Sequence, residues 1–121
     1  MGIRAGETKK DYSERLFEFT EMVKEFLNTP PSSQEHGTII TELSKCVSNL
    51  RTNSIDTRSG TSKAVFMDNT EILLRYMTET DCWLRIMKRH VNELNTADLD
   101  NLIRESGELK NILRSIAQKT N

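Results

Sequence analysis

Residues 66–94 read FMDNTEILLRYMTETDCWLRIMKRHVNEL, and the spacing of the apolar side chains in this stretch decides the fold class. Steps of four and three residues alternate along it, which places these side chains on one face of a helix with about 3.6 residues per turn. The face consists of Phe66, Thr70, Leu73, Met77, Thr80, Leu84, Met87, Val91 and Leu94. Because neither strands nor loops keep such a period over four heptads, the pattern predicts one long helix over 62–94.

The rest of the chain shows the same period in three further segments. Pro30 and Pro31 separate the first two, because proline lacks a backbone N–H and clashes with the preceding helical turn. The expected elements are helices over 8–28, 34–51 and 97–119 and a loop over the polar segment 52–61. The apolar stripes of these helices are Tyr12, Leu16, Phe19, Val23 and Phe26; Ile40, Leu43, Val47 and Leu50; and Leu99, Leu102, Ser106, Leu109, Leu113 and Ile116.

The arrangement of these helices follows from the links between them. No segment alternates apolar and polar residues over the length of a strand, so the class is all-α. Every expected link except 52–61 is short, and short links make neighbouring helices run antiparallel. We therefore expect a single domain over 1–121 that forms an up-down-up-down bundle of about four helices with a long third helix.

Charge and composition argue against several classes of function. The chain has 17 Lys and Arg against 18 Asp and Glu, and a formal charge of −1 draws in no polyanion, so nucleic-acid binding is not expected. No run of about 18 apolar residues occurs, so no membrane span is expected. Cys46 and Cys82 are too few for a disulfide framework, which favours a reducing cytoplasmic or nuclear location.

The long third helix has more apolar surface than its main stripe. Val65, Ile72, Tyr76, Trp83 and Ile86 form a second set beside that stripe. One interpretation is that two neighbouring helices cover the third helix, so that both sets belong to the core. A second is that Tyr76, Trp83 and Ile86 form part of an exposed groove for a partner helix, because aromatic side chains with a polar tip are frequent at binding hot spots. A third is that they pack locally against a loop.

Two further features suggest contacts with other molecules. Phe17 lies off the stripe of the first helix, where it either packs under a neighbouring loop or serves as a docking residue. Arg85, Lys88 and Arg89 form a basic patch that could bind phosphate or an acidic peptide, although the helix dipole also favours cations near a helix C-terminus.

The unequal lengths of helices 34–51 and 62–94 leave part of the third helix uncovered. Three explanations stay open at this point. The third helix is broken near 78–81, where Thr-Glu-Thr-Asp has weak helix propensity, or the segment 52–61 covers the excess, or the helix pairs with a second copy of the chain as a homodimer.

Catalytic and metal-binding patterns are missing from the sequence. His36, His90, Cys46 and Cys82 have none of the short spacings that mark zinc ligands, and no glycine-rich phosphate loop or nucleophile motif occurs. No cofactor is therefore expected. We expect a non-catalytic protein-protein interaction module, an adaptor or regulatory subunit that binds a partner protein, for example its amphipathic helix, through a helix face or an inter-helix groove. The alternatives are a homo-oligomerising scaffold joined through the third helix and a small ligand-binding or catalytic bundle.

Overall fold

The structure of the protein, a computed structural model, describes the backbone of residues 5–28, 37–58, 63–90 and 96–119 and the side chains of 12–28, 37–54, 69–90 and 97–118. Three expectations from the sequence lie outside these residues: the proline link, the side chains of Val65 and Phe66, and the end of the long stripe at Val91 and Leu94.

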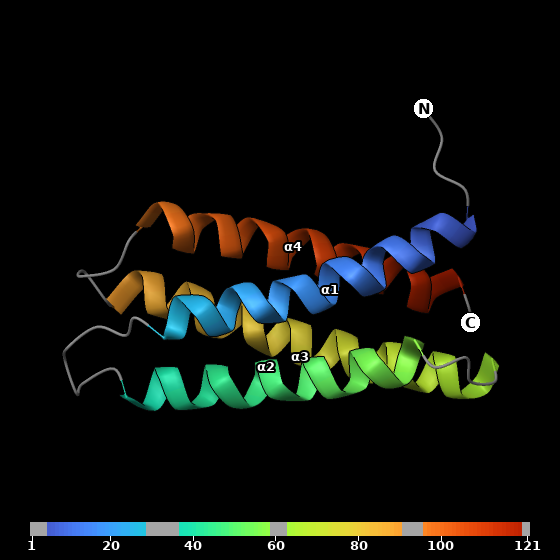
Figure 1. The fold of residues 1–121 in the computed structure, drawn as a ribbon, viewed down its shortest axis with the longest axis horizontal. Coiled ribbons are helices and arrows are strands. Elements are labelled where there is room, and N and C mark those ends of the chain that lie inside the picture. Colours follow the sequence, from blue (N-terminus) through green and yellow to red (C-terminus); the bar gives the residue numbers. More distant parts are fainter. Residues whose placement is uncertain (1–4, 29–36, 59–62, 91–95, 120–121) are drawn as a thin grey trace.

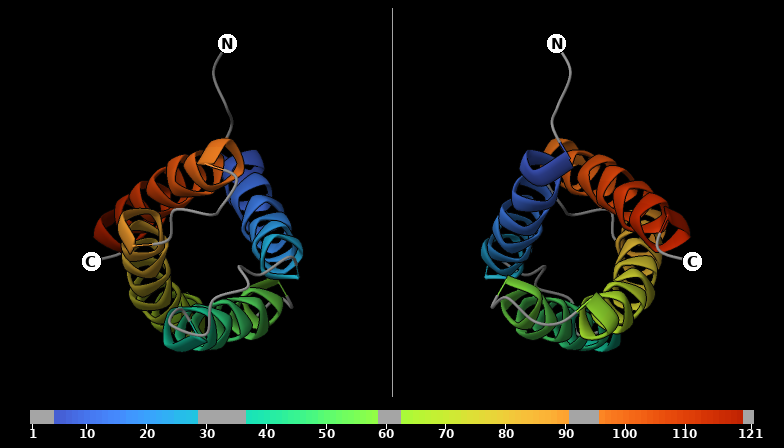
Figure 2. Two further views of the ribbon diagram at one scale, coloured as in Figure 1. Left: turned by 90° about the vertical axis from the view of Figure 1, so that its left-hand side faces the viewer. Right: turned by 90° about the vertical axis from the view of Figure 1, so that its right-hand side faces the viewer.

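Four antiparallel helices make up the described part of the chain (Figure 1). They are α1 (Ala5–Leu27), α2 (Gly37–Arg58), α3 (Lys63–His90) and α4 (Thr96–Lys119). Viewed along the bundle, the helices surround a common axis, with α1 beside α4 and α2, and α3 beside α2 and α4 (Figure 2). The predicted all-α, up-down-up-down bundle with a long third helix is confirmed.

The core is built from the apolar stripes that the sequence shows. Its buried apolar residues are Tyr12, Leu16, Phe19 and Val23 of α1, Leu43, Val47 and Leu50 of α2, Leu73, Met77, Leu84 and Met87 of α3, and Leu99, Leu102, Leu109 and Leu113 of α4. Each side chain of this size stabilises the fold by about 1.5–3 kcal/mol when it is fully removed from water. This burial holds the four helices together.

Hydroxyl side chains occupy a few positions on the core stripes without breaking the helices. The Thr80 hydroxyl donates a hydrogen bond to the Tyr76 carbonyl oxygen at 2.7 Å. Because this bond stays within α3, the Thr80 hydroxyl is satisfied without a partner from elsewhere in the core.

The predicted loop over 52–61 is wrong for residues 52–58, because α2 continues to Arg58. The Thr52 hydroxyl donates to the Ser48 carbonyl oxygen at 3.0 Å, and the Asn53 amide donates to that of Asn49 at 2.8 Å. Polar side chains that bond back onto their own helix are compatible with it. Ser54 also continues the buried stripe of α2 and is only 1% exposed.

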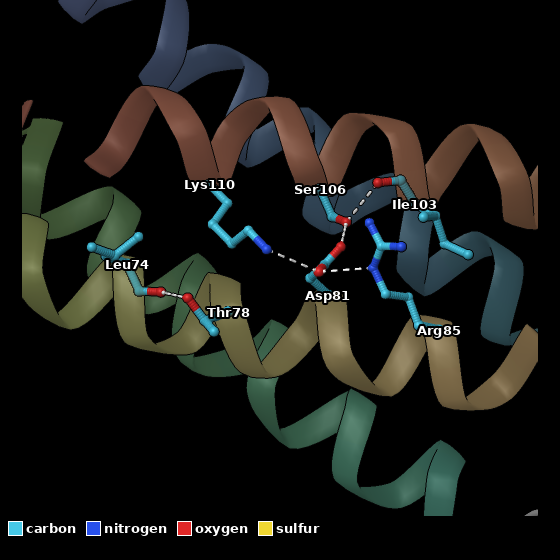
Figure 3. Close-up of polar contacts among 7 residues, drawn as sticks. All are labelled: Leu74, Thr78, Asp81, Arg85, Ile103, Ser106 and Lys110. Atoms are coloured by element: carbon cyan, nitrogen blue, oxygen red, sulfur yellow. Dashed lines mark hydrogen bonds and ion pairs between the residues drawn. The ribbon is translucent and has the colours of Figure 1, made fainter. Parts of the chain in front are cut away.

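Helix α3 is continuous, so the break considered near 78–81 is absent. The Thr78 hydroxyl donates to the Leu74 carbonyl oxygen at 2.7 Å, which satisfies it within the helix (Figure 3). With 22 residues in α2 and 28 in α3, the helices are about 33 and 42 Å long. The two helices are therefore closer in length than the sequence predicted. The difference arises because residues 52–58 of the predicted loop belong to α2.

Candidate functional site

The four seams between neighbouring helices differ in how they are held. In the α1–α4 seam, the Arg15 guanidinium pairs with Glu105 at 2.8 Å and with Glu108 at 3.3 Å. In the α1–α2 seam, Arg51 pairs with Glu21 at 2.6 Å. The α3–α4 seam also contains ion pairs, described next. Among the side chains that the structure describes, no ion pair crosses the α2–α3 seam.

The α3–α4 seam is organised around Asp81 (Figure 3). The Ser106 hydroxyl donates to Asp81 Oδ1 at 2.5 Å, and it also lies 2.8 Å from the Ile103 carbonyl oxygen, its alternative acceptor. The Lys110 ammonium and the Arg85 guanidinium donate to Asp81 Oδ2 at 3.2 and 3.0 Å. One carboxylate thus joins a residue of its own helix to two residues of α4.

Asp81 remains ionised in this setting although its side chain is only 6% exposed. Burial acts to raise the pKa of Asp81, but hydrogen bonds from Ser106, Arg85 and Lys110, together with the charge of Lys110, lower that pKa below its ordinary value. A carboxylate with a lowered pKa and with both oxygens engaged is a poor general acid or base. Its arrangement fits a structural role, which is to hold α3 against α4.

The basic patch predicted from the sequence is partly neutralised within the bundle. Arg85 pairs with Asp81, and the Lys88 ammonium pairs with Asp100 of α4 at 2.6 Å. Arg89 is exposed. Two of the three cations therefore act in the α3–α4 seam, and binding of an anion by this patch stays a prediction.

The opposite flank of α3, which faces α2, is apolar. It bears Ile72, Tyr76, Trp83 and Ile86, which we call the α3 strip; all four are half-buried. Glu79 shares this flank, and the Cys46 thiol of α2 donates a hydrogen bond to Glu79 Oε2 at 3.5 Å. That contact places the strip along the α2–α3 seam.

The α3 strip is only partly integrated into the core. Tyr76 and Trp83 pack against the core cluster, whereas Ile72 and Ile86 are half-buried and do not belong to the described residues that pack against it. Tyr76 and Trp83 contact the core, as the first interpretation expects. A surface for a partner helix stays a prediction.

Helix α2 has one apolar residue at the height of the end of the strip. Helices α2 and α3 are antiparallel, and Cys46 contacts Glu79. The residue seven positions before Cys46 is therefore at the same height along the bundle as the residue seven positions after Glu79. Ile39, which is half-buried, is therefore level with Ile86. Sequence analysis did not single out Ile39, because only the register between the two helices brings it beside the strip.

Two carboxylates lie at the middle of the strip. Glu79 falls between Tyr76 and Trp83, and Glu42 lies one turn before Cys46 on α2. Burial first, and then the hydrogen bond and negative charge of Glu79 and the charge of Glu42, raise the pKa of the Cys46 thiol to about 11. The thiol is consequently protonated at neutral pH and is a poor nucleophile or metal ligand.

Phe17 lies apart from the other predicted docking residues. The Arg51 guanidinium carbon is 4.8 Å from the centroid of the Phe17 ring, so this half-buried ring lies at the α1–α2 seam. The structure thus brings together Tyr76, Trp83 and Ile86 but not Phe17. A docking role for Phe17 stays a prediction.

The sequence analysis also missed the Asp81 network. The available signal was Ser106, a small hydroxyl residue at a stripe position where a larger apolar residue is the usual choice. A buried hydroxyl needs a hydrogen-bonding partner, and an acidic residue on a neighbouring helix can provide one. The sequence alone does not show that Asp81 and Ser106 are level with one another.

Within the described residues, no group of three or more His, Cys, Asp or Glu side chains is placed to hold a metal ion. His36 lies outside the described residues, and His90 is exposed. None of the helices described has both the length and the apolar character needed to cross a bilayer.

Comparisons with known proteins bear on the fold. No protein-family model matches the chain, and no curated protein sequence matches it. Among solved structures, the chain is similar to a protein of unknown function from the S23 ribosomal protein family of Bacteroides thetaiotaomicron, with a TM-score of 0.74 and 18% sequence identity. The match covers 92% of this chain and 98% of that chain. At this identity the likeness shows a shared fold alone, because one fold supports many functions.

Proposed function

We propose that the protein is a non-catalytic interaction module, an adaptor or regulatory subunit that binds a partner protein through the α3 strip. The observation that carries the proposal is the position of Ile72 and Ile86. Both are apolar and half-buried, and neither packs against the core cluster. Each keeps part of its apolar surface accessible beside aromatic side chains, and such an arrangement fits a binding interface.

The chemistry of the two most unusual polar residues agrees with a non-catalytic role. Asp81 is saturated by a hydroxyl and two cations, and the Cys46 thiol is protonated. Both free cysteines, Cys46 and Cys82, also support action in a reducing compartment such as the cytoplasm or nucleus.

A homo-oligomer joined through α3 is the alternative, because a second copy could also cover Ile72 and Ile86. A symmetric dimer contact has a two-fold axis, and residues near that axis meet their own copies. With the axis at the middle of the strip, two Glu79 carboxylates would face each other, and like charges placed together are unfavourable. The charge at the centre of the strip therefore favours a different protein as the partner.

The test is differential capture from the cell of origin. The bait proteins are the wild type, the double variant Ile72→Ser/Ile86→Ser, and the control Met22→Ser, which changes an apolar residue that is 43% exposed on α1. We expect a protein that wild type and control retain and that the double variant retains at least about tenfold less. Identical recovery by all three baits would refute binding through the strip.

Analytical sedimentation of the wild type distinguishes the proposed function from the homo-oligomer joined through α3. We expect a monomer across the concentration range. A dimer that Ile72→Ser/Ile86→Ser converts to monomer would replace the proposed function by self-association.

A further inference from the structure

We infer that the partner presents to the α3 strip an amphipathic helix with a Lys or Arg at the centre of its apolar face. The inference rests on the proposed function and specifies the chemistry of its partner. Three things support the inference: the position of the Glu79 and Glu42 carboxylates near the middle of the strip, the length of the strip, and the free-energy cost of removing a carboxylate from water.

Glu79 forms no ion pair within the described part of the bundle, although the exposed Arg75 lies one turn before it on α3. Its hydrogen-bonding partner there is the neutral thiol of Cys46, at 3.5 Å. Lys45 is near Glu42 at 3.5 Å, but this pair lies within α2 and the lysine side chain is 66% exposed, so the interaction is weak. In contrast, carboxylates of the other seams, among them Glu21, Asp81, Asp100 and Glu105, pair with a cation on a neighbouring helix.

Glu79 interrupts the run of apolar residues in the α3 strip. Ile72 and Tyr76 lie on one side of Glu79 along α3, and Trp83 and Ile86 lie on the other. A partner that covers both apolar halves must also cover Glu79. The carboxylate would then lose water, and it would gain nothing in return from an aliphatic side chain.

A cation on the partner changes this balance. A Lys or Arg at the centre of the docked helix would form a charge-assisted hydrogen bond with Glu79, within reach of Glu42 as well. A partner with an apolar or acidic residue at that position would leave a carboxylate unpaired or repelled. The strip therefore selects its partner by charge at the centre and by apolar contact on both sides.

The dimensions of the strip set the size of the partner helix. From Ile72 to Ile86 the α3 strip covers about 21 Å, which corresponds to about four turns of a helix laid along it. Such a helix contacts a surface with residues spaced as i, i+3 or i+4, i+7 and i+11. The cation belongs near the middle of that series.

The experiment uses the full chain and a displayed library of helical peptides about 18 residues long, a length that favours helix formation. Four positions of the apolar face are fixed as Leu, and the central position and the outer face are varied. Peptides selected on the wild type are then synthesised with Arg, Leu or Glu at the central position, and their affinities are measured by titration.

We expect Lys and Arg to be enriched at the central position. We also expect Arg-centred peptides to bind at least about tenfold more tightly than Glu-centred ones, with a preference that weakens as salt is added. Glu79→Lys should reverse the preference. The matched control is Glu14→Lys, which makes the same charge change at an exposed position of α1 and should leave the preference intact. Far-ultraviolet circular dichroism verifies that both variants remain helical, with Glu79→Gln as the substitute if the lysine variant unfolds.

The two levels of the proposal fail in different ways. If peptides bind and Ile72→Ser/Ile86→Ser abolishes binding, but neither the central residue nor Glu79→Lys matters, then the charge requirement is wrong and the strip remains a docking surface. If no selected peptide depends on Ile72 and Ile86, both the partner chemistry and the proposed function are wrong.

Discussion

Among the polar side chains described, Asp81 is expected to contribute most to the free energy of unfolding. Asp81→Asn keeps the size of the side chain but removes the charge that accepts hydrogen bonds from Ser106, Arg85 and Lys110. We expect the free energy of unfolding in urea to fall by about 1–3 kcal/mol, since hydrogen bonds to charged groups are the stronger kind. The matched control is Asp100→Asn, whose ion pair with Lys88 is half-exposed and should contribute no more than about 1 kcal/mol.

The contribution of Asp81 should also depend on pH in one direction. Because the pKa of Asp81 is lower in the folded state, its stabilisation is fully present above the unfolded-state value of about 3.9 and is lost as the pH falls through the folded value. The stability gap between wild type and Asp81→Asn should therefore shrink below about pH 4. A gap that stays constant from neutral to acidic pH would contradict the ionised state assigned to Asp81.

The two cysteines should react very differently with alkylating reagents. Cys82 is exposed, whereas Cys46 is 5% exposed and has a pKa raised to about 11. We expect iodoacetamide to label Cys82 in the native protein and Cys46 only after unfolding, because the thiolate is the reactive form. Mass spectrometry of peptides after timed labelling gives both rates, and equal rates in the native state would show that Cys46 is not shielded.

At the scale of the helix, the C-terminal part of α2 tests how well polar residues are tolerated. The Ser54 hydroxyl is buried and has no hydrogen-bonding partner among the described residues. Ser54→Ala removes this unsatisfied group and introduces a better helix former, so we expect the free energy of unfolding to rise by about 1 kcal/mol. Urea denaturation measures the change.

Ser48→Ala, at an exposed position of the same helix, is the control and should alter stability by no more than about 0.5 kcal/mol. If 52–58 were instead an exposed loop, Ser54→Ala would behave like this control.

The helices were predictable because burial repeats with the helical period. Apolar side chains at steps of three and four define a face without any knowledge of what covers it, and residues such as Leu73 and Met77 are buried as that face requires. The end of α2 was not predictable from polarity. Thr52 and Asn53 look like loop residues in the sequence, yet their side chains bond to carbonyls of the preceding turn.

The candidate site was predictable only in part, because the period of one helix does not show how its neighbours cover it. Periodicity places Tyr76, Trp83 and Ile86 together on one flank of α3, but it does not state how much of that flank α2 covers. The residues that depend on register between helices, namely Ile39 level with Ile86 and Ser106 beside Asp81, could not be read from one helix at a time.

At the scale of the whole molecule, the two flanks of α3 have different tasks. Asp81 and Lys88 hold one flank to α4 through directed polar contacts. The other flank presents the α3 strip along the α2–α3 seam. If the strip binds a partner as proposed, a helix fixed on its other side would give it a rigid support and so reduce the entropy lost on docking.

Urea unfolding of Ile72→Ser/Ile86→Ser tests most directly whether the α3 strip serves binding and not folding. Because both side chains are half-buried outside the core cluster, we predict that the free energy of unfolding falls by no more than about 3 kcal/mol in total. Truncating two core residues costs roughly 2–5 kcal/mol each. A loss of more than about 4 kcal/mol would place both isoleucines in the core and leave the bundle without the docking surface proposed for it.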